Sequence, residues 1–260
     1  MKMLIALAAA AGLSCAAQAQ VRINELMVNA PGTDDGFEFF EFSGPANAPL
    51  TNVWLIGLEG DGTGAGSVDV AIDYTGFSLG SNGLLVHRDA AGVLTPAPDA
   101  ATTLRVSDFS PDLENGTCTW VLVTGFTGAL NADLDTNNDG TLDLTPWTGV
   151  LSSIALIEND GAANIGYAAS LGGVNFGPQA GFNADAFVYG ADGQYYGMDV
   201  LGTNPGPYAF DTTRMADQSG TLVSIAGSLT PGSANTVPTP GAVALAGIGA
   251  LTALRRRRAR

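Results

Sequence analysis

Thr117-Cys-Thr-Trp-Val-Leu-Val123 is the segment that decides the fold class. In an extended chain successive side chains point to opposite faces, so Cys118, Trp120 and Leu122 share one face while threonine and valine occupy the other. Other short alternating or apolar runs, each bounded by turn residues, recur along the chain. With this one they number nine: Val21–Val28, Phe37–Phe42, Val53–Leu58, Val68–Tyr74, Leu84–His87, Thr117–Val123, Ser152–Ile157, Ala186–Tyr189 and Thr221–Ile225. Nine short strands with turn-rich connections predict an all-β fold, a β-sandwich.

Glycine and proline support the same fold class. The chain has 35 glycines and 13 prolines, and between residue 20 and the C-terminal tail they leave no uninterrupted stretch longer than 12 residues. Both residue types disfavour the interior of a helix, so long helices are not expected. Helical turns have room only in Asp99–Ser110 and Tyr208–Ser219. No repeat occurs at a fixed period, which disfavours a solenoid or a propeller.

The N-terminus has the pattern of an export signal. Met1-Lys-Met3 is a short basic region, Leu4–Leu13 is apolar, and Ala17-Gln-Ala19 is a small-residue cleavage site. We therefore expect residues 1–19 to be a signal peptide and the mature chain to begin at Gln20.

The C-terminus has the pattern of a sorting tail. Val237-Pro238-Thr239-Pro240 is followed by 14 residues of mostly apolar character, Gly241–Leu254, and then by arginines at 255, 256, 257, 258 and 260. As a helix at roughly 1.5 Å per residue, such a run spans about 21 Å, somewhat less than the roughly 30 Å of a bilayer core. Arg255, Arg256, Arg257 and Arg258 can snorkel and hold their end on the cytoplasmic side. Residues 236–240 are expected to be a linker and 241–260 a transmembrane tail, which anchors the chain transiently in the inner membrane.

The charge balance changes once both ends are removed. Four arginines and no lysine then face 25 acidic residues, a net charge of −21. Such a surface repels nucleic acid and attracts cations, so nucleic-acid binding is excluded. Cys118 is left without a second cysteine, and we expect it to be a buried, inert thiol.

The two ends together resemble the PEP-CTERM class of bacterial surface proteins. In that class a signal peptide opens the chain, and a Pro-Glu-Pro motif, a short transmembrane helix and a basic cluster close it. This chain has Thr239 where the class usually has glutamate. The resemblance implies handling by an exosortase-type membrane enzyme, followed by release or attachment at the cell surface.

The body of the chain, residues 20–235, has a resemblance of its own. Ile23-Asn-Glu-Leu26, Glu38-Phe-Phe-Glu-Phe42 and Leu50-Thr-Asn-Val-Trp-Leu55 resemble the opening of a lamin-tail domain. Gly83-Leu-Leu-Val86 is similar to a later strand of that family, and Leu229–Asn235 to its end. The resemblance implies an immunoglobulin-like β-sandwich with an insertion in its middle. It also implies a binding or scaffolding module rather than an enzyme.

One acidic segment has the spacing of a cation site. The candidate Ca²⁺ ligands are Asp133, Asp135, Asn137, Asp139, Thr141 (through its carbonyl) and Asp143. Counted from Asp135, glycine falls at the sixth position of the loop and Asp143 at the ninth, which resembles an EF-hand or dockerin-type loop. Pro146, at the twelfth position, cannot supply the usual bidentate carboxylate. The alternative is a solvated acidic turn, a common use of Asp, Asn and Gly.

A second acidic group comprises Glu25, Glu38 and Glu41, with Asp34 and Asp35 nearby. Glu25 alternates with Ile23 and Met27, so we expect it to face the core and to need a partner. Backbone amides are the favoured partners, and a second cation is the alternative.

Catalytic motifs are scarce. His87 is the only histidine and adjoins no nucleophile motif, so we expect it to be structural. Two alternatives stay open: a carbohydrate-active hydrolase using two carboxylates, and a carbohydrate-binding module. The stacking platforms of such a module would be Trp54, Trp120, Trp147 or the Tyr195-Tyr196 pair.

Overall fold

A computed structural model describes residues 20–33, 35–90, 92, 94–110, 112–114, 116–159, 163–235 and 237. The expected signal peptide and the apolar run Gly241–Leu254 lie outside these residues. Within the described part of the chain, no helix is both long enough and apolar enough to cross a membrane.

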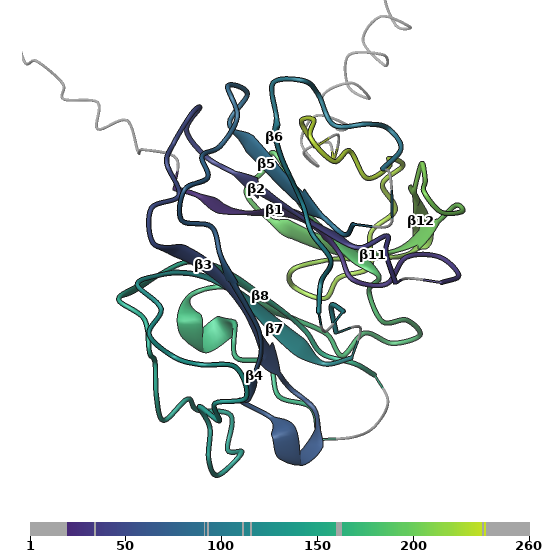
Figure 1. The fold of residues 1–260 in the computed structure, drawn as a ribbon. Helices are drawn as coiled ribbons and strands as arrows, with labels where there is room; N and C mark the ends of the chain where they lie inside the picture. Colours follow the sequence, from purple (N-terminus) through teal and green to yellow (C-terminus); the bar gives the residue numbers. More distant parts are fainter. Residues whose placement is uncertain are drawn as a thin grey trace, which may run out of the picture.

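Two β-sheets face each other and form a sandwich (Figure 1). The first sheet has seven strands in the order β12 (Ala209–Asp217), β11 (Tyr195–Leu201), β10 (Ala186–Tyr189), β1 (Arg22–Met27), β2 (Phe39–Ser43), β5 (Leu84–Arg88) and β6 (Thr103–Val106). The second has five, in the order β4 (Val68–Asp73), β3 (Val53–Glu59), β7 (Cys118–Thr124), β8 (Gly149–Leu156) and β9 (Val174–Phe176). Neighbours are antiparallel except at one edge of each sheet, where β5–β6 and β8–β9 are parallel. The only helical elements in the described residues are two 3₁₀ turns, Gly62–Gly64 and Ala169–Leu171. The predicted all-β sandwich is confirmed.

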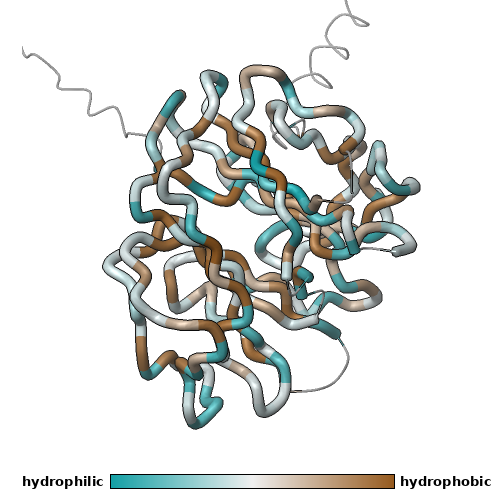
Figure 2. Tube along the Cα trace, in the orientation of Figure 1, coloured by the Kyte–Doolittle hydropathy of each residue, from teal (hydrophilic) through white to brown (hydrophobic). Residues whose placement is uncertain are grey.

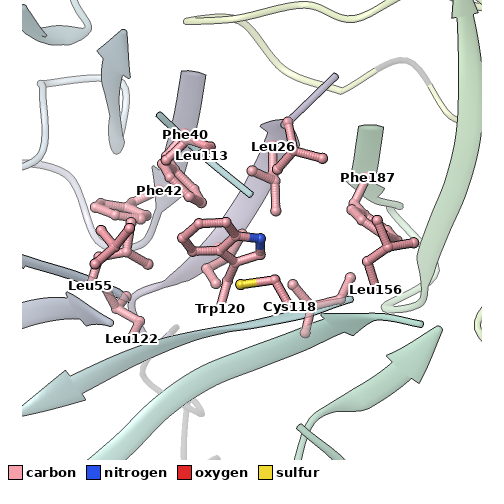
Figure 3. Packing of buried hydrophobic residues seen from close by; sticks show 14 of the residues in the cluster. Leu26, Phe40, Phe42, Leu55, Leu113, Cys118, Trp120, Leu122, Leu156 and Phe187 are labelled. Carbon is pink, nitrogen blue, oxygen red and sulfur yellow. The ribbon is translucent and has the colours of Figure 1, made fainter. Parts of the chain in front are cut away.

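The segment that decided the fold class lies at the middle of the second sheet as β7. Cys118, Trp120 and Leu122 are buried between the two sheets, as their alternation predicts. Figure 3 shows Trp120 among side chains contributed by both sheets. Its ring meets Phe40 of the opposite sheet edge to face at 5.0 Å, a geometry that aromatic pairs favour.

Both outer faces of the sandwich are also covered. Met27, Tyr196 and Met198 belong to a second hydrophobic cluster on the outer face of the seven-stranded sheet, beneath the connections that follow β5 and β11. Val121 and Val123 belong to a third cluster on the outer face of the five-stranded sheet. Figure 2 shows hydrophobic residues along the strands of both sheets and hydrophilic ones in several loops. Two sheets therefore support three hydrophobic layers.

Eight of the nine predicted runs contain a strand, and the ninth does not. Thr221–Ile225 instead lies along the free edge of β12, where the Val223 amide donates to the Met215 carbonyl. The two segments with room for helical turns hold β6 and β12, so that expectation was wrong. Their β-structure comes from pairing with β5 and β11, a tertiary contact that local sequence does not encode.

β9 and β11 were also missed, and Gly197 explains the second omission. This glycine interrupts the apolar pattern of Tyr195–Leu201. A Cβ atom at this position would lie 2.5 Å from the Phe176 ring. The glycine is therefore a point of close packing within a strand rather than a turn.

The last described segment, Leu229–Asn235 with Val237, crosses the outer face of the seven-stranded sheet; we call it the C-terminal strap. Leu229 and Val237 are only 1% and 3% exposed and belong to the outer cluster of that sheet. The packed body thus reaches Val237, inside the segment 236–240 that was expected to be a linker.

Candidate functional site

The predicted Ca²⁺ loop sits on the outer face of the five-stranded sheet. Leu134 inserts into the hydrophobic cluster there and is 2% exposed. Asp135, next in the chain, is completely buried. Its Oδ2 accepts a hydrogen bond of 2.9 Å from the Tyr167 hydroxyl. Burial, together with this bond, raises the pKa of Tyr167. The first position of the loop is therefore anchored to the body of the protein.

The Asp135 carboxylate also organises the turn. It accepts the backbone amides of Asp139 at 3.2 Å and of Gly140 at 2.9 Å. Gly140 has φ of +85°, a conformation that glycine adopts without strain. The sharp turn expected at the sixth loop position is present.

The other acidic side chains of the loop turn toward near neighbours. Asp143 Oδ2 accepts the Thr136 amide at 3.0 Å and the Thr136 hydroxyl at 2.6 Å, and these bonds lower the pKa of Asp143. Asp133 Oδ1 accepts the Asp135 amide at 3.0 Å. Asp139 accepts the Asn137 side-chain amide at 3.1 Å and the Thr141 backbone amide at 2.9 Å. All of these side chains except Asp135 are exposed. The donor set consists only of oxygen atoms and suits a hard cation, but in this conformation the acids are spread along the loop rather than gathered.

Glu25 and Glu41, from the second acidic group, are 1% and 0% exposed and face each other across β1 and β2. A β-bulge between Ile23 and Glu25 changes the alternation, so Ile23 faces the inner core while Glu25 lies beneath the C-terminal strap. The expectation that Glu25 shares the face of Ile23 is therefore wrong, because the bulge inserts one residue.

Backbone amides of the strap satisfy this pair. The Thr230 amide donates to both oxygens of Glu25, at 2.9 and 3.1 Å. Glu41 accepts the Gly232 amide and the Asn24 side-chain amide. The favoured prediction of amide partners is confirmed. Burial and the neighbouring Glu41 raise the pKa of Glu25 well above its usual range, and burial raises the pKa of Glu41 to about 7.

Glu38 belongs to a different cluster. Its carboxylate, that of Asp89 and that of Asp112 offer ligand atoms within 4.8 Å of one another. Glu38 accepts the Leu113 amide at 3.1 Å, and Asp89 accepts the Phe109 amide at 3.1 Å. These acids therefore fasten the 107–113 connection, as Glu25 and Glu41 fasten the strap. Of the other predicted members, Asp35 is exposed and Asp34 lies outside the described residues.

The sequence did not reveal the two partners of His87. Its Nε2 lies 2.7 Å from the Ser107 hydroxyl, and its Nδ1 lies 2.7 Å from the Tyr74 hydroxyl. A serine, a histidine and an orienting group in line are the parts of a nucleophilic site. No sequence pattern links the two residues, because Ser107 comes 20 residues after His87, next to β6, a strand that was not predicted.

The hydrogen-bond roles, however, argue against a catalytic base. Within the described residues the buried Tyr74 hydroxyl has no hydrogen-bond partner other than His87, so it must donate to Nδ1 to avoid an unsatisfied donor. The ring proton then resides on Nε2 and is donated to Ser107. In this tautomer His87 cannot accept the serine proton. Burial, together with Arg105, lowers the pKa of His87 to about 3. The arrangement clamps β4, β5 and the 107–113 connection together.

A slot of about 250 Å³ opens above His87, between β4 and the segment that follows β6. Asp69 and Asp73 lie along the β4 wall, and Arg105 and Asp108 along the other. Burial raises the pKa of Asp69. The sequence did not single out these carboxylates among the 25 acidic residues.

Three of the five predicted stacking aromatics are buried, and the other two are half-buried. Trp120, Tyr195 and Tyr196 are 1%, 6% and 1% exposed. Trp54 and Trp147 are half-buried and pack against the outer cluster of the five-stranded sheet. The three buried rings therefore offer no exposed face on which a sugar could stack.

Comparison with known proteins gives no match: no protein-family model, curated protein or solved structure is similar to this chain.

Proposed function

We propose that this chain is an exported, non-catalytic protein of the cell surface or extracellular matrix. Its ends would act as in the PEP-CTERM class, with an exosortase-type membrane enzyme as processing partner. Its body would be a lamin-tail-like, immunoglobulin-like sandwich that serves as a binding or scaffolding module.

The attachment of the C-terminal strap carries this proposal. Two buried carboxylates hold Thr230 and Gly232, and Val237, the first residue of the predicted sorting motif, is packed in the outer cluster. In the sequence only residues 238–240 separate this packed valine from the apolar run that begins at Gly241. Such a connection suits a domain displayed at a fixed position on a surface.

Ca²⁺ is the proposed stabilising ligand of the module. Asp135, Asn137, Asp139, the Thr141 carbonyl and Asp143 would supply oxygen ligands, with Asp133 or a distant acid completing the shell. The preformed turn around Gly140 supports this assignment. A cation there would also offset part of the −21 charge of the body.

The test is to compare the full chain with a chain that ends at Val237, so that the buried valine is kept. We expect the full-length precursor to fractionate with membranes and the truncated protein to be freely secreted. A second variant with Arg255, Arg256, Arg257 and Arg258 changed to serine tests the basic cluster alone. Identical fractionation of all three proteins would refute the sorting role.

A carbohydrate-active hydrolase is the alternative that one observation favours. Asp69 and Asp108 line opposite walls of the slot above His87, and the raised pKa of Asp69 suits a general acid. The wild type and the Asp69→Asn variant are incubated with soluble polysaccharides and assayed for released reducing ends. If the wild type releases them and Asp69→Asn does not, the protein is a hydrolase rather than a binding module. We expect no release from either protein.

A further inference from the structure

Two adjacent hollows share a wall beside the start of β1 and the end of β10, and the smaller one also reaches β8 and β9 of the other sheet. Their volumes are about 560 Å³ and 490 Å³, and both are lined by Arg22, Tyr189 and Gly193. Arg22 and Tyr189 therefore form a ridge between the hollows. We call the two hollows and this ridge the Arg22 groove.

The guanidinium of Arg22 packs against an aromatic ring but is not paired with a carboxylate of the described residues. Its guanidinium carbon lies 4.6 Å from the centre of the Tyr189 ring, a cation–π contact that fixes the plane of the fork. The other three arginines of the body have acceptors: Arg88 and Arg105 donate to backbone carbonyls, and Arg214 pairs with Asp199 at 3.0 Å. Among the described residues Arg22 has no carboxylate or carbonyl acceptor. Its N–H groups remain available to a ligand.

The walls of the smaller hollow are neutral and rich in hydrogen-bonding groups. The smaller hollow has no carboxylate in its lining. The side-chain nitrogen of Gln20 donates to the Leu151 carbonyl, so the side-chain oxygen of Gln20 remains available as an acceptor. The side-chain oxygen of Gln218 accepts the Tyr195 backbone amide, so the side-chain nitrogen of Gln218 remains available as a donor. Ser152 adds a hydroxyl beside the Tyr195 hydroxyl, at 3.0 Å.

The larger hollow contains one acidic side chain, Asp192. Each of its oxygens already accepts one hydrogen bond, from the Tyr196 hydroxyl at 2.6 Å and from the Gln194 amide at 3.2 Å. By contrast, the slot above His87 is lined by Asp69, Asp73 and Asp108. In a body of charge −21, the Arg22 groove is thus a place where an anionic group would meet a guanidinium with little competition from carboxylates.

We propose that the Arg22 groove binds an acidic glycan, with a sugar carboxylate on the guanidinium of Arg22 and sugar hydroxyls on Gln20, Ser152 and Gln218. A guanidinium fork matches a carboxylate in a bidentate geometry. Amide and hydroxyl groups can both donate to and accept from sugar hydroxyls. This assignment rests on the proposed function as a binding module and names the ligand class of that module.

A glycan fits the groove better than an acidic peptide does. Peptide and protein recognition usually relies on apolar or aromatic anchors that fill pockets. The smaller hollow is instead bordered by Gly172, Gly173 and Gly193, with polar side chains around them. Polar side chains line this hollow beside Leu151, Val174 and the tyrosine rings, so an anionic ligand with many hydroxyls matches it better than a peptide that binds through an apolar anchor.

The test is calorimetric titration of the folded body, residues 20–237, at about 0.15 M salt, where the Debye length is roughly 8 Å. The probes are a short oligogalacturonate, a neutral maltooligosaccharide of equal length and a polyglutamate peptide. Arg22→Gln removes the charge from the groove, and Arg214→Gln removes an exposed arginine elsewhere. Thermal melts show whether both variants remain folded.

We expect the oligogalacturonate to bind the wild type and Arg214→Gln equally, and to bind Arg22→Gln about tenfold more weakly or worse, as loss of a charge-assisted pair implies. We expect neither of the other probes to bind comparably. Equal loss in the two variants, no binding of oligogalacturonate, or equally tight binding of polyglutamate or maltooligosaccharide would overturn the proposal. None of these outcomes would alter the fractionation result that tests the sorting tail.

Discussion

Glu25 and Glu41 lie directly opposite each other on β1 and β2, and both carboxylates accept backbone amides from the same C-terminal strap. Asp185 repeats this solution, because its Oδ2 accepts the Val200 amide at 3.0 Å. With four arginines and no lysine in the body, buried acids are satisfied mainly by amides instead of cations. Arg214–Asp199 is the one ion pair within the described residues.

These buried acids make stability depend on pH. The pKa of Glu41 is raised to about 7, that of Asp185 to about 6, and that of Glu25 also rises, while all three titrate near 4 in the unfolded chain. A raised pKa favours folding while the group stays protonated, so this stability is fully present below about pH 4 and is lost progressively as the pH rises from there through 6 to 7. We expect the free energy of unfolding to fall by on the order of 2 kcal/mol between pH 5 and pH 8, measured by urea titration.

Glu25→Gln is the matched control for that measurement. Both Glu25 oxygens accept from the single Thr230 amide, so a glutamine can keep one of these bonds. The substitution removes one titrating group and the charge next to Glu41. The pH dependence should therefore become shallower. An unchanged slope in this variant would show that the pair is not its source.

Gly232→Ala should loosen the C-terminal strap. Gly232 has φ of +79°, and a Cβ there would lie 2.4 Å from Pro98 Cβ. Strain and overpacking together predict a loss of about 1–3 kcal/mol. Gly76→Ala separates the two effects, because Gly76 has φ of +94° but open space around it. If both variants lose equal stability in thermal melts, the contact with Pro98 contributes nothing.

Ca²⁺ should raise the melting temperature through the Asp133–Asp143 loop. At the roughly 10⁻⁴–10⁻³ M affinity of extracellular Ca²⁺ modules, millimolar Ca²⁺ stabilises by on the order of 1 kcal/mol. The exposed Asp139 can be changed to alanine with little effect on the packed body, and the Ca²⁺ shift should then disappear. Mg²⁺ should substitute poorly because it demands tighter octahedral geometry. Equal Ca²⁺ shifts in the wild type and Asp139→Ala would place the site elsewhere.

Asp135→Ala tests the structural part of the same loop. Asp135 is buried and accepts the Tyr167 hydroxyl and the Gly140 amide. Its removal leaves these donors unpaired, so we expect a loss of about 1–3 kcal/mol with or without Ca²⁺. Tyr167→Phe should cost less, because it removes only one of the bonds. Full stability of Asp135→Ala in chelator would mean that the loop is not anchored by this residue.

Tyr74→Phe tests the hydrogen-bond roles around His87. Without the tyrosine donor, Nδ1 loses its hydrogen-bond partner and the proton is no longer confined to Nε2. We expect a stability loss of about 1–3 kcal/mol and a change in the ¹⁵N shifts of the ring nitrogens. Wild-type shifts typical of an Nδ1–H tautomer would contradict the assignment and reopen a catalytic role for Ser107.

The sequence predicted those parts of the fold that depend on local patterns. Thr117–Val123 alternates and is a central strand, because both of its faces are buried by hydrophobic neighbours. Thr103–Val106 does not look like a strand, since it is stabilised by pairing with β5 across a long connection. The bulge at Ile23 and Glu25 was also beyond prediction, because it is set by the partner strand β2.

The candidate sites were likewise predictable only where they depend on residues close together in the sequence. The turn at Gly140 follows from contiguous spacing, so the sequence places these residues in one loop, and their role as a Ca²⁺ site stays a prediction. The pairing of His87 with Ser107, and the neutral lining around Arg22, join residues that are distant in sequence. Sequence patterns give no register between distant segments, so no motif could have revealed these two arrangements.

The bond between Thr230 and Glu25 joins residues 205 positions apart. When a chain emerges N-terminus first, Glu25 and Glu41 emerge long before the strap residues that cover them. Closing so long a loop is slow, and it cannot begin until the final segment is free. The outer layer of the seven-stranded sheet is therefore completed last, by the strap residues Leu229–Asn235 and Val237. In the proposed export, folding would remain unfinished until the strap has emerged, so the chain would stay in a form that can still be threaded through a channel.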